Sequence, residues 1–117
     1  MELQKLIDYC LNKTATKQEF PFDDTTLVCK VGDKMFALIS LTKPHYINLK
    51  CDPIIAVGLR QKYKAVTAGY HMHKKHWNTV KFDGSIPEQL VQEWGDQSYE
   101  LVVRNMSKVE RTKLSSG

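Results

Sequence analysis

The sequence predicts an α+β fold in which helices flank short antiparallel strands. Three observations lead to this prediction. Residues 3–11 have the apolar spacing of a helix, and residues 26–50 contain three strand-like runs joined by tight turns. A helix start, two further strand-like runs and a longer helical pattern then follow from residue 52 onward. With 117 residues the chain is long enough to bury a core, and we expect one domain spanning 1–117.

The first helix and the first strand are indicated by their apolar periods. Leu3, Leu6, Ile7, Cys10 and Leu11 follow the i, i+3, i+4, i+7, i+8 pattern of an amphipathic helix. After Pro21 and a polar cluster, residues 26–31 are rich in β-branched side chains that alternate between two faces. We therefore expect a helix over 3–11 and a strand over 26–31.

A hairpin and a third strand should complete a meander. Gly32-Asp33 suits a two-residue type II′ turn, which would join the first strand to a second one over 34–41. Residues 42–45 form another turn signal, and 46–50 read as the third strand. Three consecutive antiparallel strands result.

Two further strands are expected between two helices. Asp52 before Pro53 is an N-terminal helix signal, because the carboxylate accepts from free amides and proline has no N–H to leave unpaired. Residues 66–72 and 77–82 read as strands, with the basic residues 73–76 at the turn between them.

The last part of the chain reads as helical. Ser85 with Glu88 matches a capping box that would begin a third helix, and Ser107 with Glu110 repeats the pattern before a short final helix. Gly95-Asp96 leaves open whether the third helix is continuous or divided.

Charge is concentrated in the middle of the chain. Residues 43–83 hold eight Lys/Arg against Asp52 and Asp83, a net charge of +6, together with all four histidines. Residues 1–42 and 84–117 each have a net charge of −1. A positive zone between slightly acidic flanks favours an anionic partner such as nucleic acid, with solubility as the alternative explanation.

The sequence shows no sign of export, membrane insertion or disulfides. Charges interrupt the apolar residues at the start, and the longest wholly apolar run, Met35 to Ile39, falls far short of the roughly 20 residues of a membrane-spanning helix. Cys10, Cys29 and Cys51 are widely spaced and read as reduced, mostly buried thiols. We expect a cytoplasmic monomer without membrane contact.

Residues 69–80 contain the best candidate for a binding site. This segment combines three histidines, two adjacent lysines and a tryptophan, which suits an anionic, partly planar ligand better than a protein core. The predicted nucleic-acid-binding residues are Lys74, Lys75, His71, His76, Trp77 and Tyr70, with Lys50, Lys43 and Lys81 extending the phosphate contacts. The alternative is a solvated basic turn with Trp77 packed into the core.

Other kinds of site have less support. His71, His73 and His76 lie close in sequence, but the segment contains no cysteine or carboxylate and matches no standard zinc spacing, so we expect no metal and no cofactor. Nucleophile elbows, P-loops and dinucleotide-binding glycine motifs are absent, and we expect no enzyme, although acid–base chemistry by His71 or His76 stays open.

Seven motifs occur in order between about Pro21 and Val109. They are Val31-Gly32-Asp33-Lys34-Met35-Phe36-Ala37, Leu49-Lys50-Cys51-Asp52-Pro53, Leu59-Arg60, Gly69-Tyr70-His71-Met72, Lys74-Lys75-His76-Trp77-Asn78-Thr79-Val80, Asp83-Gly84 and Ser98-Tyr99-Glu100-Leu101-Val102. Together they resemble the MmcQ/YjbR family of small bacterial proteins. The resemblance implies a two-layer α/β sandwich, α-β3-α-β2-α, with helices on one face of an antiparallel sheet, as in secretion-chaperone-like folds. His73 departs from the asparagine more usual in the family.

The resemblance also implies DNA binding, a label that the family carries by analogy of its hairpins with winged DNA-binding modules. Fold analogy alone does not establish function. The second hypothesis is a protein-interaction or chaperone-like module that uses a sheet face or edge, with Phe36, Tyr46 and Tyr70 as candidate contact residues. Lysines gathered along one groove would favour nucleic acid, whereas lysines spread over all faces would favour a protein partner.

Overall fold

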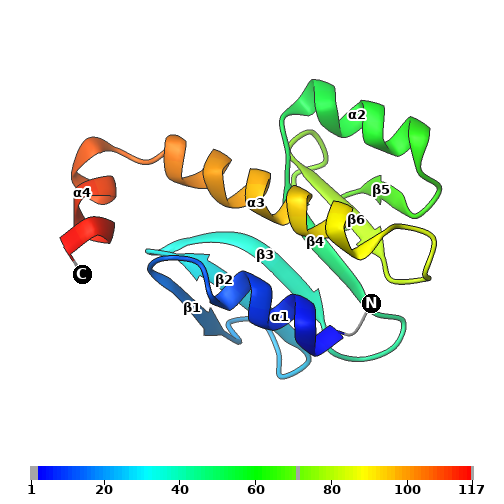
Figure 1. The fold of residues 1–117 in the computed structure, drawn as a ribbon, viewed down its shortest axis with the longest axis horizontal. Helices are drawn as coiled ribbons and strands as arrows, with labels where there is room; N and C mark the ends of the chain where they lie inside the picture. Colours follow the sequence, from blue (N-terminus) through cyan, green and yellow to red (C-terminus); the bar gives the residue numbers. More distant parts are fainter. Residues whose placement is uncertain (1–2, 71, 117) are drawn as a thin grey trace.

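The computed structural model describes residues 3–70 and 72–116, and it contains one antiparallel sheet with helices packed on one face (Figure 1). The predicted α+β class is confirmed. The elements are α1 (Leu3–Leu11), β1 (Thr16–Glu19), β2 (Thr26–Val31), β3 (Lys34–Ser40), β4 (Tyr46–Lys50), α2 (Pro53–Lys62), β5 (Val66–Ala68), β6 (Trp77–Lys81), α3 (Glu88–Arg104) and α4 (Lys108–Ser116). In the described part of the chain, no helix has both the length and the apolar character needed to span a bilayer.

The six strands follow the order β1-β2-β3-β4-β6-β5, and each neighbouring pair is antiparallel. The predicted hairpin turn is present, since Val31 pairs with Lys34 across Gly32-Asp33. Gly32 has φ 59°, a conformation that costs glycine little and other residues more. Strands β5 and β6 pair with each other, and β6 joins them to the meander β2-β3-β4 by pairing with β4.

The edge strand β1 was not predicted from the sequence. Its residues Thr-Lys-Gln-Glu are polar and largely exposed, so no apolar period marks them as a strand. The strand forms because its backbone pairs with β2, with Thr16 opposite Val31 and Glu19 opposite Val28. The sheet therefore has one strand more than the expected five.

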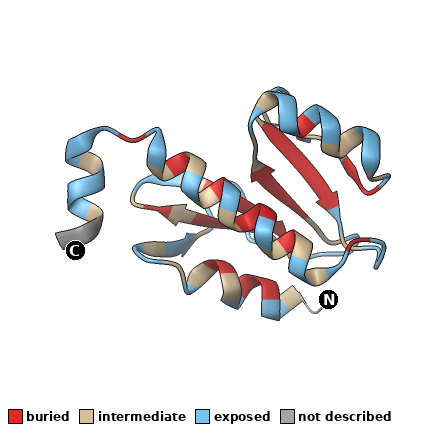
Figure 2. Cartoon of the chain, turned by 45° about the horizontal axis from the view of Figure 1, so that its top comes forward, coloured by how far each residue is buried: buried red, intermediate tan, exposed pale blue. Residues whose placement is uncertain are grey.

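The main core lies between the sheet and the helices α1, α2 and α3 (Figure 2). Rings from different helices and strands meet there edge to face, with centroids 5.3 Å apart for Phe36 and Tyr99 and 5.4 Å apart for Tyr63 and Trp94. Helix α3 is continuous through Gly95 and Asp96. Asp96 instead ties α1 to α3, because its carboxylate accepts hydrogen bonds from the Tyr9 hydroxyl and the Lys13 amine.

Two of the three predicted helix caps are confirmed. The Asp52 carboxylate accepts from the amides of the first turn of α2, and Ser107 and Glu110 accept from each other's backbone N–H groups at the start of α4. The capping box predicted for Ser85 and Glu88 is wrong. Asp83 accepts from the amide and hydroxyl of Ser85 in a local turn, and α3 begins later, at Glu88, without a side-chain cap.

A smaller apolar cluster lies on the sheet face opposite the helices. It consists of Val28, Leu38 and Trp77, with Met35 and Met72 packed against it. No described helix residue belongs to this cluster. We call this side of the sheet the open face.

Candidate nucleic-acid interface

Lysines from several strands share the open face. Directly paired residues of antiparallel strands have side chains on the same face. The registers pair Lys17 with Lys30, Lys30 with Met35, Lys50 with Trp77 and Lys81 with Tyr46. Trp77 belongs to the open-face cluster, so Lys50 and, by alternation along β6, Lys81 lie on that face too.

Carboxylates neutralise only one side of this row. Glu19 is 3.5 Å from Lys17 and 3.3 Å from Lys30, and Asp33 is 3.6 Å from Lys17. Near β4 and β6, the lysines lack such carboxylate partners among the described residues. Within residues 3–70 and 72–116, no ion pair involves Lys50, Lys74 or Lys75, so their charges are available to an anion.

The turn at residues 73–76, which we call the basic turn, is held in place by Arg60 of α2. The Arg60 Nε donates to Asn78 Oδ1 at 2.6 Å, and its Nη2 donates to the carbonyls of Lys74 and, at 3.3 Å, of Trp77. Asn78 in turn donates to the Ala56 carbonyl at 3.3 Å. The guanidinium thus fixes the backbone beside Lys74 and Lys75, and it is already engaged within the protein.

The segment that leads into the turn is fixed on the open face. The amide of Tyr70 donates to Thr79 Oγ1 at 2.9 Å, and that hydroxyl donates to the buried Asn48 amide oxygen. A Cβ on Gly69 would lie 2.7 Å from the Trp77 Cβ, so only glycine fits there. β5 ends at Ala68, whereas the predicted strand ran to residue 72. At Tyr70 the amide donates to the Thr79 side chain instead of a backbone carbonyl, so the strand pairing does not continue.

The aromatic and imidazole candidates contribute less ring surface than predicted. Trp77 is only 8% exposed, which agrees with the packed alternative and leaves little of the indole for stacking. Tyr70 is 60% exposed. His76 is half-buried against the His73 ring at 4.8 Å, and its carbonyl accepts from the Cys51 amide at 2.7 Å. His71 lies outside the described residues.

The eight predicted site residues that the structure describes do not form one group. Lys50, Lys74, Lys75, His76 and Trp77 lie together where β4 ends and β6 begins. Lys81 is at the opposite end of β6, about 13 Å along the strand. Lys43 is in the loop between β3 and β4, at the same end as Lys81. The structure therefore separates Lys43 and Lys81 from the basic turn.

Sequence reasoning missed a groove beside Lys50. The groove is lined by Lys34, Met35, Lys50, Trp77, Val102, Asn105 and Met106. These residues come from the start of β3, the ends of β4 and α3, and the start of β6, so no local sequence pattern could reveal it. The quoted motifs nevertheless contain Lys34, Met35, Lys50, Trp77 and Val102.

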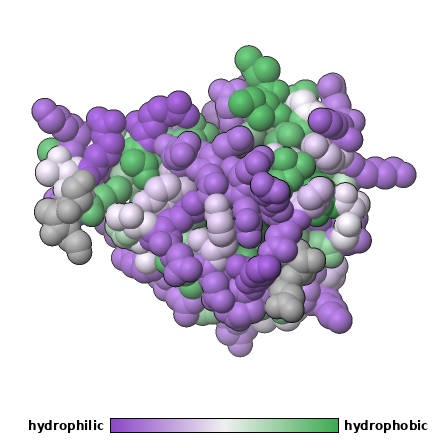
Figure 3. All heavy atoms as spheres, in the orientation of Figure 1, coloured by the Kyte–Doolittle hydropathy of each residue, from purple (hydrophilic) through white to green (hydrophobic). Residues whose placement is uncertain are grey.

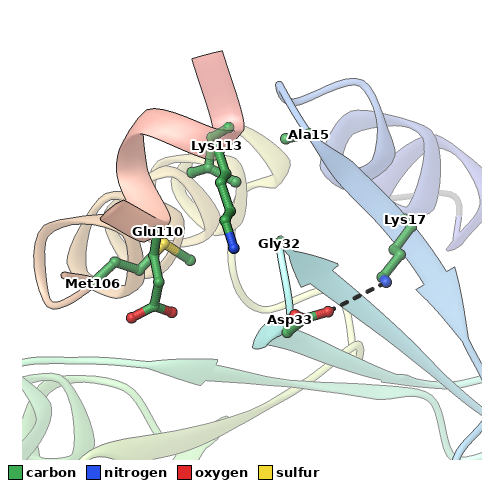
Figure 4. A pocket seen from close by; sticks show the side chains of 8 residues that line it. Ala15, Lys17, Gly32, Asp33, Met106, Glu110 and Lys113 are labelled. Carbon is green, nitrogen blue, oxygen red and sulfur yellow. Dashed lines mark ion pairs between the residues drawn. The ribbon is translucent and has the colours of Figure 1, made fainter. Parts of the chain in front are cut away.

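A second hollow lies between α4 and the β2–β3 turn (Figure 4). Lys17 and Lys113 line it together with Asp33 and Glu110, and Lys17 is paired with Asp33. Because charges of both signs are present, this hollow offers an anion no clear advantage. We therefore place the candidate site at the groove and the basic turn.

The protein-contact alternative loses one of its predicted residues. Phe36 is fully buried against α3, since the bulge between β2 and β3 turns it to the helix face, so it is not a surface residue. Tyr70 is exposed, and the other large exposed apolar side chains of the described residues lie elsewhere, namely Ile54, Ile55 and Val57 on α2, Phe20 and Phe22 after β1, and Val109 on α4. Figure 3 shows apolar atoms over α2.

Metal chemistry gains no support from the described residues. Among residues 3–70 and 72–116, no three His, Cys, Asp or Glu side chains come together in a way that could hold an ion. The rings of His73 and His76 lie 4.8 Å apart, and the described residues supply no third ligand of this kind.

Comparisons with known proteins give a family and a fold. A family model described as YjbR matches residues 11–101. The uncharacterized protein YjbR of Escherichia coli (strain K12) is 33% identical over 115 residues, which cover 97% of each chain. The uncharacterized protein YbdF of Escherichia coli O157:H7 is 36% identical over 99 residues, 84% of this chain and 81% of that protein.

Solved structures agree with this result. The crystal structure of Deinococcus radiodurans protein DR2400, described as family-model domain DUF419, superposes with a TM-score of 0.90 at 38% identity and covers 97% of this chain and 87% of that chain. The crystal structure of a protein from Pseudomonas syringae gives a TM-score of 0.75 at 28% identity, covering 86% of this chain and 98% of that one. The names of these relatives and solved structures state no activity.

Proposed function

The chain belongs to the YjbR family, and from the lysines on its open face we propose that it binds nucleic acid, with DNA as the expected ligand. One observation carries the proposal. Lys50 is in direct register with Trp77 next to the basic turn, and Lys50, Lys74 and Lys75 have no ion-pair partner in the described part of the chain. The Lys74 amine donates to the Gly69 carbonyl at 3.4 Å. Because no described carboxylate neutralises these three ammonium groups, they suit a phosphate backbone.

Low sequence specificity follows from the same side chains. Lysine acts as a point charge, whereas the planar fork of arginine suits bidentate contacts to guanine. The arginine nearest the site, Arg60, already uses Nε and Nη2 within the protein. Contacts to phosphates therefore dominate, and base readout is minor.

Salt-dependent binding tests the proposal. Fluorescence anisotropy with labelled duplex DNA, single-stranded DNA and RNA should give log Kd that rises linearly with log[salt], and contacts to about four phosphates would give a slope in log K near −3.6 on duplex DNA. The variant Lys50→Ala/Lys75→Ala should make this slope about 1.8 less steep. No binding by the wild type in dilute buffer would overturn the proposal.

A matched control uses lysines away from the site. Lys5 on α1 and Lys108 on α4 are exposed, and the double variant Lys5→Ala/Lys108→Ala removes the same net charge. This control should bind with an unchanged slope. Equal losses in both double variants would point to net charge alone and contradict a located site.

A protein contact through α2 is the second candidate function. The observation that favours it is the exposure of Ile54, which is 84% accessible, beside the exposed side chain of Val57 one turn later. Sedimentation of the wild type and of Val57→Glu would show whether this surface joins copies of the chain. Nucleic-acid binding that persists in Val57→Glu would separate the two functions.

A further inference from the structure

We infer that the groove beside Lys50 receives one unpaired base of a nucleic-acid strand, so that the site prefers single strands to duplexes. This inference rests on the proposed function and specifies its ligand.

The groove exists because β3 and β4 stop pairing before either strand ends. Their paired residues run only from Ala37 opposite Leu49 to Ile39 opposite Ile47. Beyond Leu49, the Ser98 hydroxyl of α3 stands between the strands, accepting from the Lys50 amide at 2.9 Å and donating to the Phe36 carbonyl at 2.6 Å. Residues of β3, β4, β6 and α3 then line the gap.

Apolar and sulfur-containing side chains make up much of the groove. Met35, Trp77, Val102 and Met106 line it, and thioethers make favourable contacts with aromatic rings. The Asn105 amide can both donate to and accept from the polar edge of a base. A flat heteroaromatic ring matches this mixture better than a phosphate or a sugar does.

Cations stand at the same groove. Lys34 and Lys50 line it, from the start of β3 and the end of β4. Hydrogen bonds from Ser107 lower the pKa of Glu110, and the charge of Lys34 lowers it further. Lys50 of β4 pairs with Trp77 of β6, and the next residue, Cys51, donates its amide hydrogen to the His76 carbonyl. Lys50 therefore lies next to the basic turn. Phosphates on both sides of the inserted base would meet cations.

The size of the groove limits what can enter. Its volume is about 210 Å³, below the roughly 300 Å³ at which sites for drug-sized ligands begin. One base fits such a space, whereas the stacked, paired bases of a duplex present only their edges. A duplex would have to unpair before it used the groove, and a single strand would not.

Abasic oligonucleotides test the inference directly. Anisotropy would compare a labelled single strand of twelve thymidines with the same strand carrying abasic sites throughout and with its duplex. The intact strand should bind about five-fold or more tightly than the abasic strand, since one stacked base contributes at least this much. Equal affinity for all three, with binding retained, would overturn the inference and leave the proposed function standing, whereas no binding to any would overturn both.

Two methionines provide matched variants. Met35→Ala removes a groove side chain, and Met72→Ala removes a methionine of the same open-face cluster that does not line the groove. Met35→Ala should lose the discrimination between intact and abasic strands, and Met72→Ala should keep it. Retained discrimination in Met35→Ala, with the variant shown by circular dichroism to be folded, would contradict a base in this groove.

A free nucleotide is the other source of the same chemistry. Thymidine monophosphate would be added as a competitor of the labelled strand. Displacement only at concentrations far above the strand's Kd supports a strand ligand that also uses the basic turn. Displacement at a concentration similar to the strand's Kd would overturn the inference of a strand ligand and identify a mononucleotide site.

Discussion

The hydroxyl of Ser98 accepts a 2.9 Å hydrogen bond from the backbone N–H of Lys50, and it thereby links the middle of α3 to the end of β4. The same hydroxyl donates to the Phe36 carbonyl at 2.6 Å. Ser98 is fully buried. Its two hydrogen bonds form a side-chain bridge at a place where β3 and β4 would otherwise pair directly. Both the gap between these strands and the position of Lys50 depend on this residue.

Replacing Ser98 with alanine should destabilise the protein by about 1–3 kcal/mol, because it leaves the part-buried N–H of Lys50 and the buried C=O of Phe36 without this partner. Urea unfolding followed by circular dichroism measures this change in the free energy of unfolding. Ser85→Ala is the control, since Ser85 is exposed and bonds only locally to Asp83, and it should cost less than about 0.5 kcal/mol. Equal stability of Ser98→Ala and the wild type would show that the strands can pair directly.

Elements with a clear apolar period were predictable from the sequence. α1 and β2 have the predicted bounds, and Asp52 and Ser107 cap their helices as expected. β1 was missed because a polar edge strand is specified by its neighbour rather than by its own pattern. The Ser85 box failed because Asp83, two residues before it, offers a nearer acceptor.

The site was predictable only in part for a related reason. The basic turn is local in sequence, so its lysines could be identified directly. The groove joins residues as far apart as Met35 and Met106, and Arg60 reaches the turn from a helix. Contacts between distant segments leave no period in the sequence, so no local pattern marks Arg60 as a partner of the basic turn.

Arg60→Lys should loosen the basic turn without changing the net charge. A lysine amine cannot reproduce contacts from both Nε and Nη2 to Asn78, Lys74 and Trp77. We expect a loss of about 1–3 kcal/mol in unfolding free energy and faster amide hydrogen exchange at residues 76–78. Arg104→Lys, at an exposed position near the end of α3, should change neither quantity. Unchanged exchange in Arg60→Lys would contradict the anchoring role.

The separation of the lysines predicts unequal effects on binding. Lys50 and Lys81 share the open face, about 13 Å apart along the strands, so a long single strand can reach both. Lys50→Ala and Lys81→Ala should each make the salt slope about 0.7 less steep on single-stranded DNA. Lys43→Ala, in the loop beyond the strands, should leave the slope unchanged. A loss for Lys43→Ala equal to that for Lys50→Ala would contradict a ligand path along β4 and β6.

The start of α4 should respond to acid. Hydrogen bonds from Ser107 lower the pKa of Glu110, so the ionised carboxylate stabilises the folded helix above the ordinary glutamate pKa of about 4.3, and this contribution is lost as the pH falls through the lowered pKa. Carbon chemical shifts of residues 108–112 should lose helical character on acidification. Glu110→Gln cannot titrate, and its shifts should stay constant across this range. A wild-type helix that is insensitive to acid would contradict the cap's contribution.

The three thiols should differ in reactivity. Cys10 and Cys29 are fully buried, whereas Cys51 is half-buried. Burial raises the pKa of the Cys51 thiol. The pKa of Cys29 is raised mainly by a hydrogen bond with Cys10 and also by burial. Both residues therefore carry little thiolate near neutral pH. Ellman's reagent should therefore modify Cys51 slowly in the native protein and reach the other two only on unfolding, and Cys51→Ser should abolish the native reaction. Native reaction of two thiols at similar rates would show that the helix-side core opens readily.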